Sequence, residues 1–142
     1  MEHVHADLTR RIIGGAIAVH RALGPGLLES AYEQCLVLEL EALGLRVRRQ
    51  VPIDLVFRGQ RIEGAYRLDL VVGGVVVVEI KAVDRVLPIH EAQMLTYLKL
   101  LPSPVGLLMN FNVARLADGI RRVVHSDPSA PSPRPLRLGG ES

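Results

Sequence analysis

Hydrophobic side chains recur at three- and four-residue intervals in three segments, a spacing that predicts three helices. The first is expected over about 7–23, with Asp7 as its N-cap. The second is expected over about 28–43, after the helix-breaking "LGPG" segment, and Gly44 ends it. The third begins at Pro88, since proline is favoured in the first turn of a helix, and covers "PIHEAQMLTYLKLL".

Between the second and third helices the hydrophobic period shortens to two, which indicates β-strands. Alternation over 51–57 is followed by a turn, a strand over about 61–72, and a second turn at Gly73-Gly74. The run "VVVVEIKAV", 75–83, then predicts a buried central strand. After the third helix, "PVGLLMNF" and "IRRVVH" predict two more strands.

This order of elements predicts an α/β fold with a mixed sheet. The first three strands form a meander, and the third helix links two parallel strands in a right-handed βαβ crossover. Helices then flank both faces of the sheet. We expect a single domain over 1–125, followed by a disordered tail over 126–142, which holds four of the nine prolines.

Composition narrows the class of protein. At 142 residues, 49% hydrophobic and 23% charged, the chain is typical of one soluble globular domain. No apolar run approaches the roughly 18 residues of a membrane span, and "MEHVHADLTRR" lacks signal-peptide features, so we expect a cytoplasmic protein. The single Cys35 excludes an internal disulfide. The net charge of +2 does not by itself indicate nucleic acid.

Two charged residues interrupt the valine-rich strand: Glu79 and Lys81. Such residues are rarely buried without a partner. They could form a structural ion pair with distant parts of the protein. Alternatively, the strand borders a cleft in which these charges meet a ligand.

Asp69 lies on the preceding strand, and the turn length decides where it faces. A two-residue turn pairs Val72 with Val75 and places Asp69 on the opposite side of the sheet from Glu79. A three-residue turn pairs Val72 with Val76 and places the two acids directly opposite, with Cβ atoms about 4.5–5.5 Å apart. Two opposed carboxylates could share a hard divalent cation such as Mg²⁺ or Mn²⁺. Without a metal the two-residue hairpin is favoured, because opposed like charges are destabilising.

These residues resemble a known family. Asp69, nine intervening residues and Glu79-Ile80-Lys81 are similar to the signature of the PD-(D/E)XK nuclease superfamily, although Leu68 stands where its proline is found. "GLLESAY", 26–32, is similar to the G-x-x-E-x-x-Y motif of the GxxExxY family. "QMLTY", 93–97, is similar to the Q-x-x-x-Y element of the RecB-like branch.

The resemblance, over roughly 6–124, implies a restriction-endonuclease-like core and a metal-dependent nuclease, with DNA as the expected substrate. It implies metal ligation by the carboxylates of Asp69, Glu79 and Glu29 and by the Ile80 carbonyl, with Mg²⁺ or Mn²⁺ as the cofactor. Lys81 would orient or activate the attacking water and stabilise charge on the phosphate. The implied catalytic residues are Glu29, Asp69, Glu79, Lys81, Gln93 and Tyr97.

The same residues also admit purely structural roles. Glu29 could be a first-turn acid that stabilises its helix, Gln93 could cap backbone groups, and Tyr32 could be a packing residue. The protein could be a catalytically inert module of the same fold that binds nucleic acid or another protein, or could hydrolyse a small phosphoester. Because the chain is small, a homodimer or a partner protein could complete the substrate groove.

Overall fold

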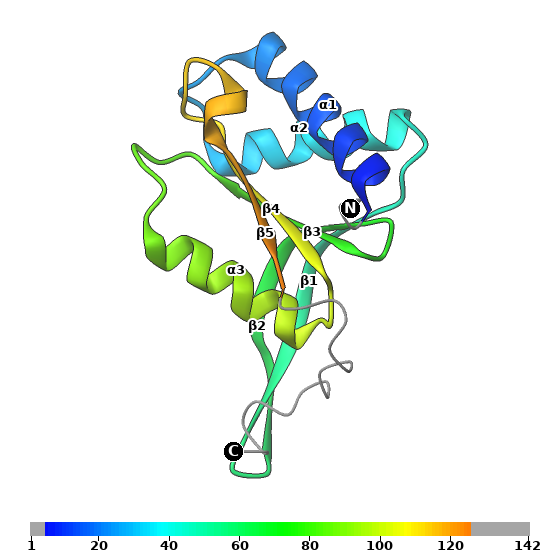
Figure 1. The fold of residues 1–142 in the computed structure, drawn as a ribbon, viewed down its shortest axis with the longest axis vertical. Helices are drawn as coiled ribbons and strands as arrows, with labels where there is room; N and C mark the ends of the chain where they lie inside the picture. Colours follow the sequence, from blue (N-terminus) through cyan, green and yellow to red (C-terminus); the bar gives the residue numbers. More distant parts are fainter. Residues whose placement is uncertain (1–4, 126–142) are drawn as a thin grey trace.

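The computed structural model of the protein describes residues 5–125. Its elements are shown in Figure 1: α1 (Ala6–Leu23), α2 (Glu29–Ala42), β1 (Val47–Phe57), β2 (Gln60–Val72), β3 (Val76–Lys81), α3 (Pro88–Leu100), β4 (Val105–Asn110), the 3₁₀ helix η1 (Leu116–Gly119) and β5 (Ile120–Val124). The three expected helices are confirmed, but His5, not Asp7, is the N-cap of α1, and Asp7 lies in its first turn. The predicted tail over 126–142 lies outside the described residues.

The five strands form one mixed sheet in the order β1-β2-β3-β4-β5. Neighbouring strands are antiparallel except β3 and β4, which are parallel and are connected through α3. The predicted α/β fold, with its meander and its βαβ unit, is therefore confirmed.

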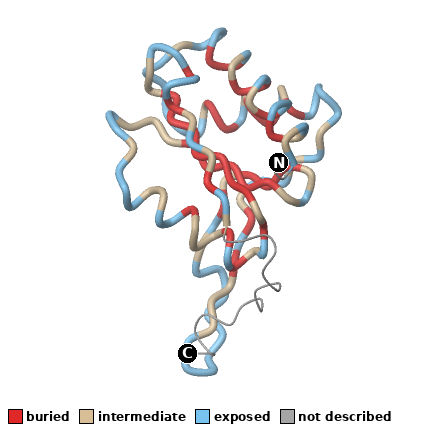
Figure 2. Tube along the Cα trace, in the orientation of Figure 1, coloured by how far each residue is buried: buried red, intermediate tan, exposed pale blue. Residues whose placement is uncertain are grey.

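Helices cover both faces of this sheet. The apolar sides of α1 and α2 pack with Val76, Val78 and Ile80 of β3 on one face, while α3 packs against Val77 and Leu108 on the other. Figure 2 shows buried residues concentrated along the central strands. Since both sides of β3 and β4 are covered, their sequences are almost continuously apolar. Within residues 5–125 no helix has the length and apolarity needed to cross a membrane.

The β1–β2 hairpin projects beyond the rest of the protein (Figure 1). Its pairing shifts register between Ile53 and Leu55, which marks an irregularity in the ladder. Asp54 fixes this irregularity, because its carboxylate accepts the N–H of Gly64 at 2.9 Å and pairs with Arg61 at 2.5 Å. The outer end of the hairpin is thus held by these side-chain contacts although it is exposed.

Candidate metal centre

The turn between β2 and β3 determines how the acids meet. Val72 pairs with Val76, so three residues form the turn, and the alternative two-residue hairpin is wrong. Gly73 and Gly74 have φ angles of 62° and 75°, a region that glycine enters without steric cost. Valine follows them as the third turn residue.

The β2–β3 ladder ends at the pair formed by Leu70 and Val78, although both strands continue past it. Continuing the same register by one residue puts Asp69 opposite Glu79. There, Asp69 Oδ2 accepts the Ile80 N–H at 2.8 Å, and Glu79 Oε2 accepts the Asp69 N–H at 3.0 Å. Each carboxylate therefore bonds to a backbone amide of the opposite strand, and the two acids lie side by side.

Burial dominates the electrostatics of this pair. It raises the pKa of the Glu79 carboxyl to about 8, and the neighbouring charge of Asp69 adds to the rise. Burial also raises the pKa of Asp69, although the hydrogen bond from the Ile80 amide opposes this. The positive charge of Lys81 lowers both pKa values in part. A divalent cation suits this arrangement, because it would favour the ionised form of both carboxylates at once.

Two further charged residues lie near the acid pair: Lys81 on β3 and Glu29 on α2. Lys81 is half-buried at the end of β3, and no ion pair joins it to Glu79 within the described part of the chain, so a simple structural pair does not explain the two charges. Glu29 begins α2, and its Oε2 accepts the N–H of Ala82 at 3.0 Å. This bond ties the start of α2 to the end of β3.

The acids do not form a closed three-ligand cage. Across residues 5–125 no three His, Cys, Asp or Glu side chains are placed to hold a metal ion together. Glu29 raises the pKa of Asp69 through its charge, so it lies within electrostatic reach of Asp69. The geometry thus supplies two adjacent carboxylates, with Glu29 further away.

Two residues of helix α3, Gln93 and Tyr97, were predicted to belong to the site, and only Tyr97 lies near the acids. Tyr97 is half-buried and packs edge-on against Tyr66, with ring centroids 5.7 Å apart. Burial raises the pKa of its hydroxyl, and the charges of Glu79 and Asp69 raise it further, which places Tyr97 near both acids. Gln93 is exposed one turn earlier and makes no hydrogen bond to any residue in the described range. His90 accepts the Leu87 N–H through Nδ1 at 2.9 Å and so caps the helix.

Comparison with known families agrees with this fold. The profile of the PD-(D/E)XK nuclease superfamily matches residues 6–123, which include every residue of the candidate site. The chain belongs to the PD-(D/E)XK nuclease superfamily. Proteins of this superfamily generally use divalent metal ions. No curated protein and no solved structure shows significant similarity to the chain.

Within this PD-(D/E)XK fold, the residues of "GLLESAY" have two kinds of role: Gly26 and Tyr32 are structural, and Glu29 lies beside the site. Tyr32 is fully buried, and its hydroxyl donates to the Gly24 carbonyl and accepts the Leu27 N–H at 3.1 Å. Gly26 has a φ of 100°, which a residue with a side chain rarely adopts. Gly26 and Tyr32 therefore shape the loop that leads to Glu29.

Two polar residues near the site were not predicted. Glu33 is buried one turn after Glu29 and bonds to Arg49 at 3.1 Å and to Gln50 at 3.0 Å. Its charge raises the pKa of Asp69. Asn110 is buried at the end of β4, where its amide accepts the Val83 N–H at 3.0 Å and donates to the Val83 carbonyl at 2.9 Å.

The sequence contains a signal for each of these two residues, Glu33 and Asn110. A second glutamate four residues after Glu29 shares its helix face. Asn110 ends an apolar strand and pairs in register with Lys81 of the neighbouring strand. Their partners, however, come from segments distant in sequence, so only the fold could identify them.

Proposed function

We propose that this PD-(D/E)XK protein is a Mg²⁺- or Mn²⁺-dependent nuclease that hydrolyses phosphodiester bonds, with DNA as its substrate. The observation that carries the proposal is the meeting of Asp69 and Glu79 at the end of the β2–β3 ladder. Burial raises the pKa of both acids there, and the charge of Asp69 raises that of Glu79 further. Such a pair is costly in a metal-free sheet and suited to a hard dication.

In this proposal Asp69, Glu79 and the Ile80 carbonyl hold the cation, and Glu29 reaches it through water. When bound, the cation would polarise the scissile phosphodiester and lower the pKa of a coordinated water. Lys81, which is half-buried near the acids, stabilises negative charge on the phosphate and orients the attacking water.

The residues of α3 would act by hydrogen bonding. Because the pKa of Tyr97 is raised, its hydroxyl keeps its proton at neutral pH and serves as a donor. Gln93, exposed on the same helix, would contact the nucleic acid from the solvent side. Both assignments follow from the similarity of "QMLTY" to the RecB-like element, as the proposed role of Glu29 follows from the GxxExxY motif.

We also propose where the protein acts and what completes its substrate groove. The protein would act in the cytoplasm. A second copy of the chain or a partner protein would complete the substrate groove, because a single domain of this size has little surface beyond the site for holding a duplex.

A second candidate is an inert module of the same fold that binds nucleic acid or a protein. It is favoured by the hydrogen bonds that Asp69 and Glu79 already make to backbone amides, and by the lack of a three-ligand group within residues 5–125. In such a module the two acids would serve only to terminate the ladder.

Nuclease assays distinguish the candidates. Single- and double-stranded DNA and RNA are incubated with the wild type in Mg²⁺, Mn²⁺ or EDTA, beside Glu79→Gln and the exposed control Glu63→Gln. We expect metal-dependent DNA cleavage that Glu79→Gln reduces by more than about 100-fold, since even outer partners of metal ligands cost 10–100-fold. Glu63→Gln, on the projecting hairpin, should cleave as the wild type does.

Two results would contradict the nuclease proposal. Equal cleavage by the wild type and a folded Glu79→Gln variant would remove Glu79 from the site. Absence of Mn²⁺ binding by calorimetry at millimolar metal, together with absence of cleavage, would favour the inert module.

A further inference from the structure

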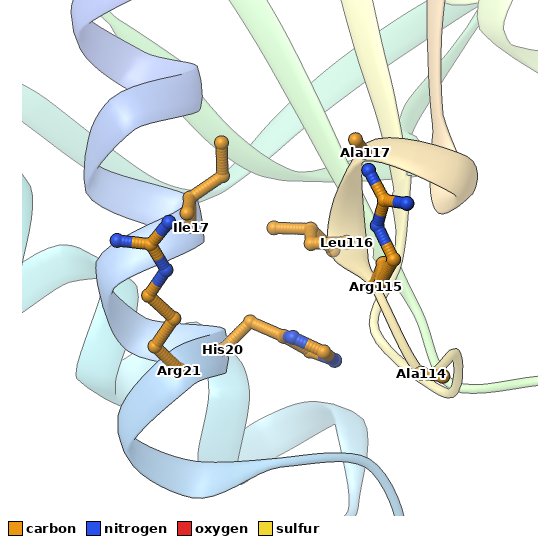
Figure 3. Close-up of a pocket in the computed structure, with 7 residues that line it drawn as sticks. All are labelled: Ile17, His20, Arg21, Ala114, Arg115, Leu116 and Ala117. Atoms are coloured by element: carbon orange, nitrogen blue, oxygen red, sulfur yellow. The ribbon is translucent and has the colours of Figure 1, made fainter.

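A second feature with chemical character is a pocket of about 220 Å³ between α1 and the segment that leads into η1 (Figure 3). It does not include the acid pair. The residues that line it are Ile17, His20, Arg21, Ala114, Arg115, Leu116 and Ala117. Ile17 and Leu116 supply apolar walls, and the polar groups are all basic.

The charge of the pocket favours an anion. Among the described residues that line it, none carries a carboxylate. Arg21 and Arg115 are exposed, and neither makes an ion pair within residues 5–125. Figure 3 shows Arg21 on the α1 side of the pocket and Arg115 on the opposite side. Guanidinium groups without a carboxylate partner on two sides of a hollow suit a phosphate group.

His20 gives the pocket a fixed wall. It is buried, and its Nε2 lies 2.8 Å from the Val113 carbonyl oxygen. Because a carbonyl only accepts, Nε2 carries a proton and donates. The ring also packs against Phe111, with centroids 6.1 Å apart. The anion would thus be held by the two arginines beside a rigid surface.

The pocket lies at the same end of the sheet as the acid pair. Phe111, directly after β4, donates its N–H to the Lys81 carbonyl at 2.8 Å and contacts the His20 ring. One residue therefore bridges Lys81 and the pocket wall. In open α/β sheets, ligands bind beyond the carboxyl ends of the strands, which here are the ends of β3 and β4.

We propose that Arg21 and Arg115 bind a backbone phosphate of the nucleic-acid strand, one other than the phosphate being hydrolysed, and so hold the strand across this end of the sheet. The choice of nucleic acid as the ligand rests on the proposed function. The phosphate chemistry rests on the pocket itself.

The test is the salt dependence of oligonucleotide binding, measured by fluorescence anisotropy in EDTA so that no cleavage occurs. Each neutralised phosphate contributes a slope of about −0.9 for duplex DNA, or about −0.7 for a single strand, in log K against log[salt]. The double variant Arg21→Gln/Arg115→Gln should lose about one such contribution. The control Arg10→Gln, an exposed α1 arginine paired with Asp7, should keep the wild-type slope.

The outcomes separate this proposal from the nuclease proposal. A reduced slope in the double variant supports the pocket even if the wild type cleaves nothing. An unchanged slope, or no oligonucleotide binding by the wild type, overturns it. A parallel titration with inorganic phosphate distinguishes the source of the anion: if the arginine variants lose free phosphate but bind the oligonucleotide normally, the pocket serves a small phosphate compound and the proposal is wrong.

Discussion

At the scale of single residues, the site depends on a competition between hydrogen bonding and burial. The backbone amides that Asp69 and Glu79 accept from favour their ionised forms, as does the charge of Lys81. Burial favours the protonated forms, and so does repulsion from nearby carboxylates: Asp69 acts on Glu79, and Glu33 and Glu29 act on Asp69. The second pair of effects is larger, since both pKa values are raised, and Glu79 reaches about 8.

This balance predicts that stability falls with rising pH in the metal-free protein. Glu79 titrates near 4.5 in the unfolded chain and near 8 in the folded protein. Between these values the folded state holds a proton that the unfolded state has lost, so raising the pH favours unfolding by up to about 1.4 kcal/mol per pH unit. Urea denaturation in EDTA between these pH values should show the decline.

Glu79→Gln should remove most of that decline, because glutamine does not titrate. A smaller decline should remain, since the pKa of Asp69 is raised in the same direction. The exposed variant Glu63→Gln serves as the control and should follow the wild type. Identical declines in the wild type and Glu79→Gln would show that Glu79 is not perturbed.

At the scale of elements, the site exists because β2 and β3 separate early. Their ladder holds three pairs, and the acids occupy the next position, where carboxylates replace backbone acceptors. Other contacts hold the neighbouring ends in place: Glu29 bonds to Ala82, and Asn110 bonds to Val83. The end of β3 is thus fixed from α2 and from β4.

Close packing of η1 on β4 predicts a steric test of this end of the sheet. A Cβ atom added at Gly119 would lie 2.2 Å from the Asn110 carbonyl oxygen, which is too close without a backbone shift. We expect Gly119→Ala to lower the free energy of unfolding by about 1–3 kcal/mol, as overpacking does. Denaturant unfolding measures this directly.

Gly14 is the matched control, because it lies on α1 with no atom near its would-be Cβ. Gly14→Ala should leave stability unchanged or raise it by up to about 1 kcal/mol, the gain in helix propensity. If Gly119→Ala proved as stable as Gly14→Ala, the packing of η1 against β4 would differ from the one described.

The sequence predicted regular elements well and the joints between them less well. The helix 7–23 was expected within one residue of α1, because its apolar spacing is strong. The strand β1 begins at Val47, earlier than the expected 51, since Arg48 and Arg49 interrupt the alternation. The turn length after Val72 could not be decided, because "VVGGVV" admits two registers with similar apolar faces.

The site residues also divide into those that the sequence could predict and those that it could not. Motif spacing suggested the positions of Asp69 and Glu79, and the register then brought them together. Glu33 and Asn110 could not be assigned, because their partners are set by tertiary contacts. Gln93 was expected at the cleft, yet it is exposed with no hydrogen bond in the described range, and its proposed role depends on the bound substrate.

At the scale of the whole molecule, the polar residues of both candidate sites lie at one end of an otherwise apolar sheet. Helices bury both faces, which leaves the carboxyl ends of β3 and β4 for chemistry. The acid pair, Lys81 and the arginine pocket all lie around these ends, connected through Phe111. In our proposal, a nucleic-acid strand would pass over this end, from the α3 face that carries the acids to the α1 face that carries the pocket.

The central claim is that Asp69 and Glu79 hold one divalent cation, and anomalous diffraction from a Mn²⁺-bound crystal tests it most directly. At a pH above about 8, where Glu79 is ionised, we predict a manganese peak between the two carboxylates. A map at saturating Mn²⁺ with no peak there, and with both carboxylates still bonded to the amides of Ile80 and Asp69, would contradict the account.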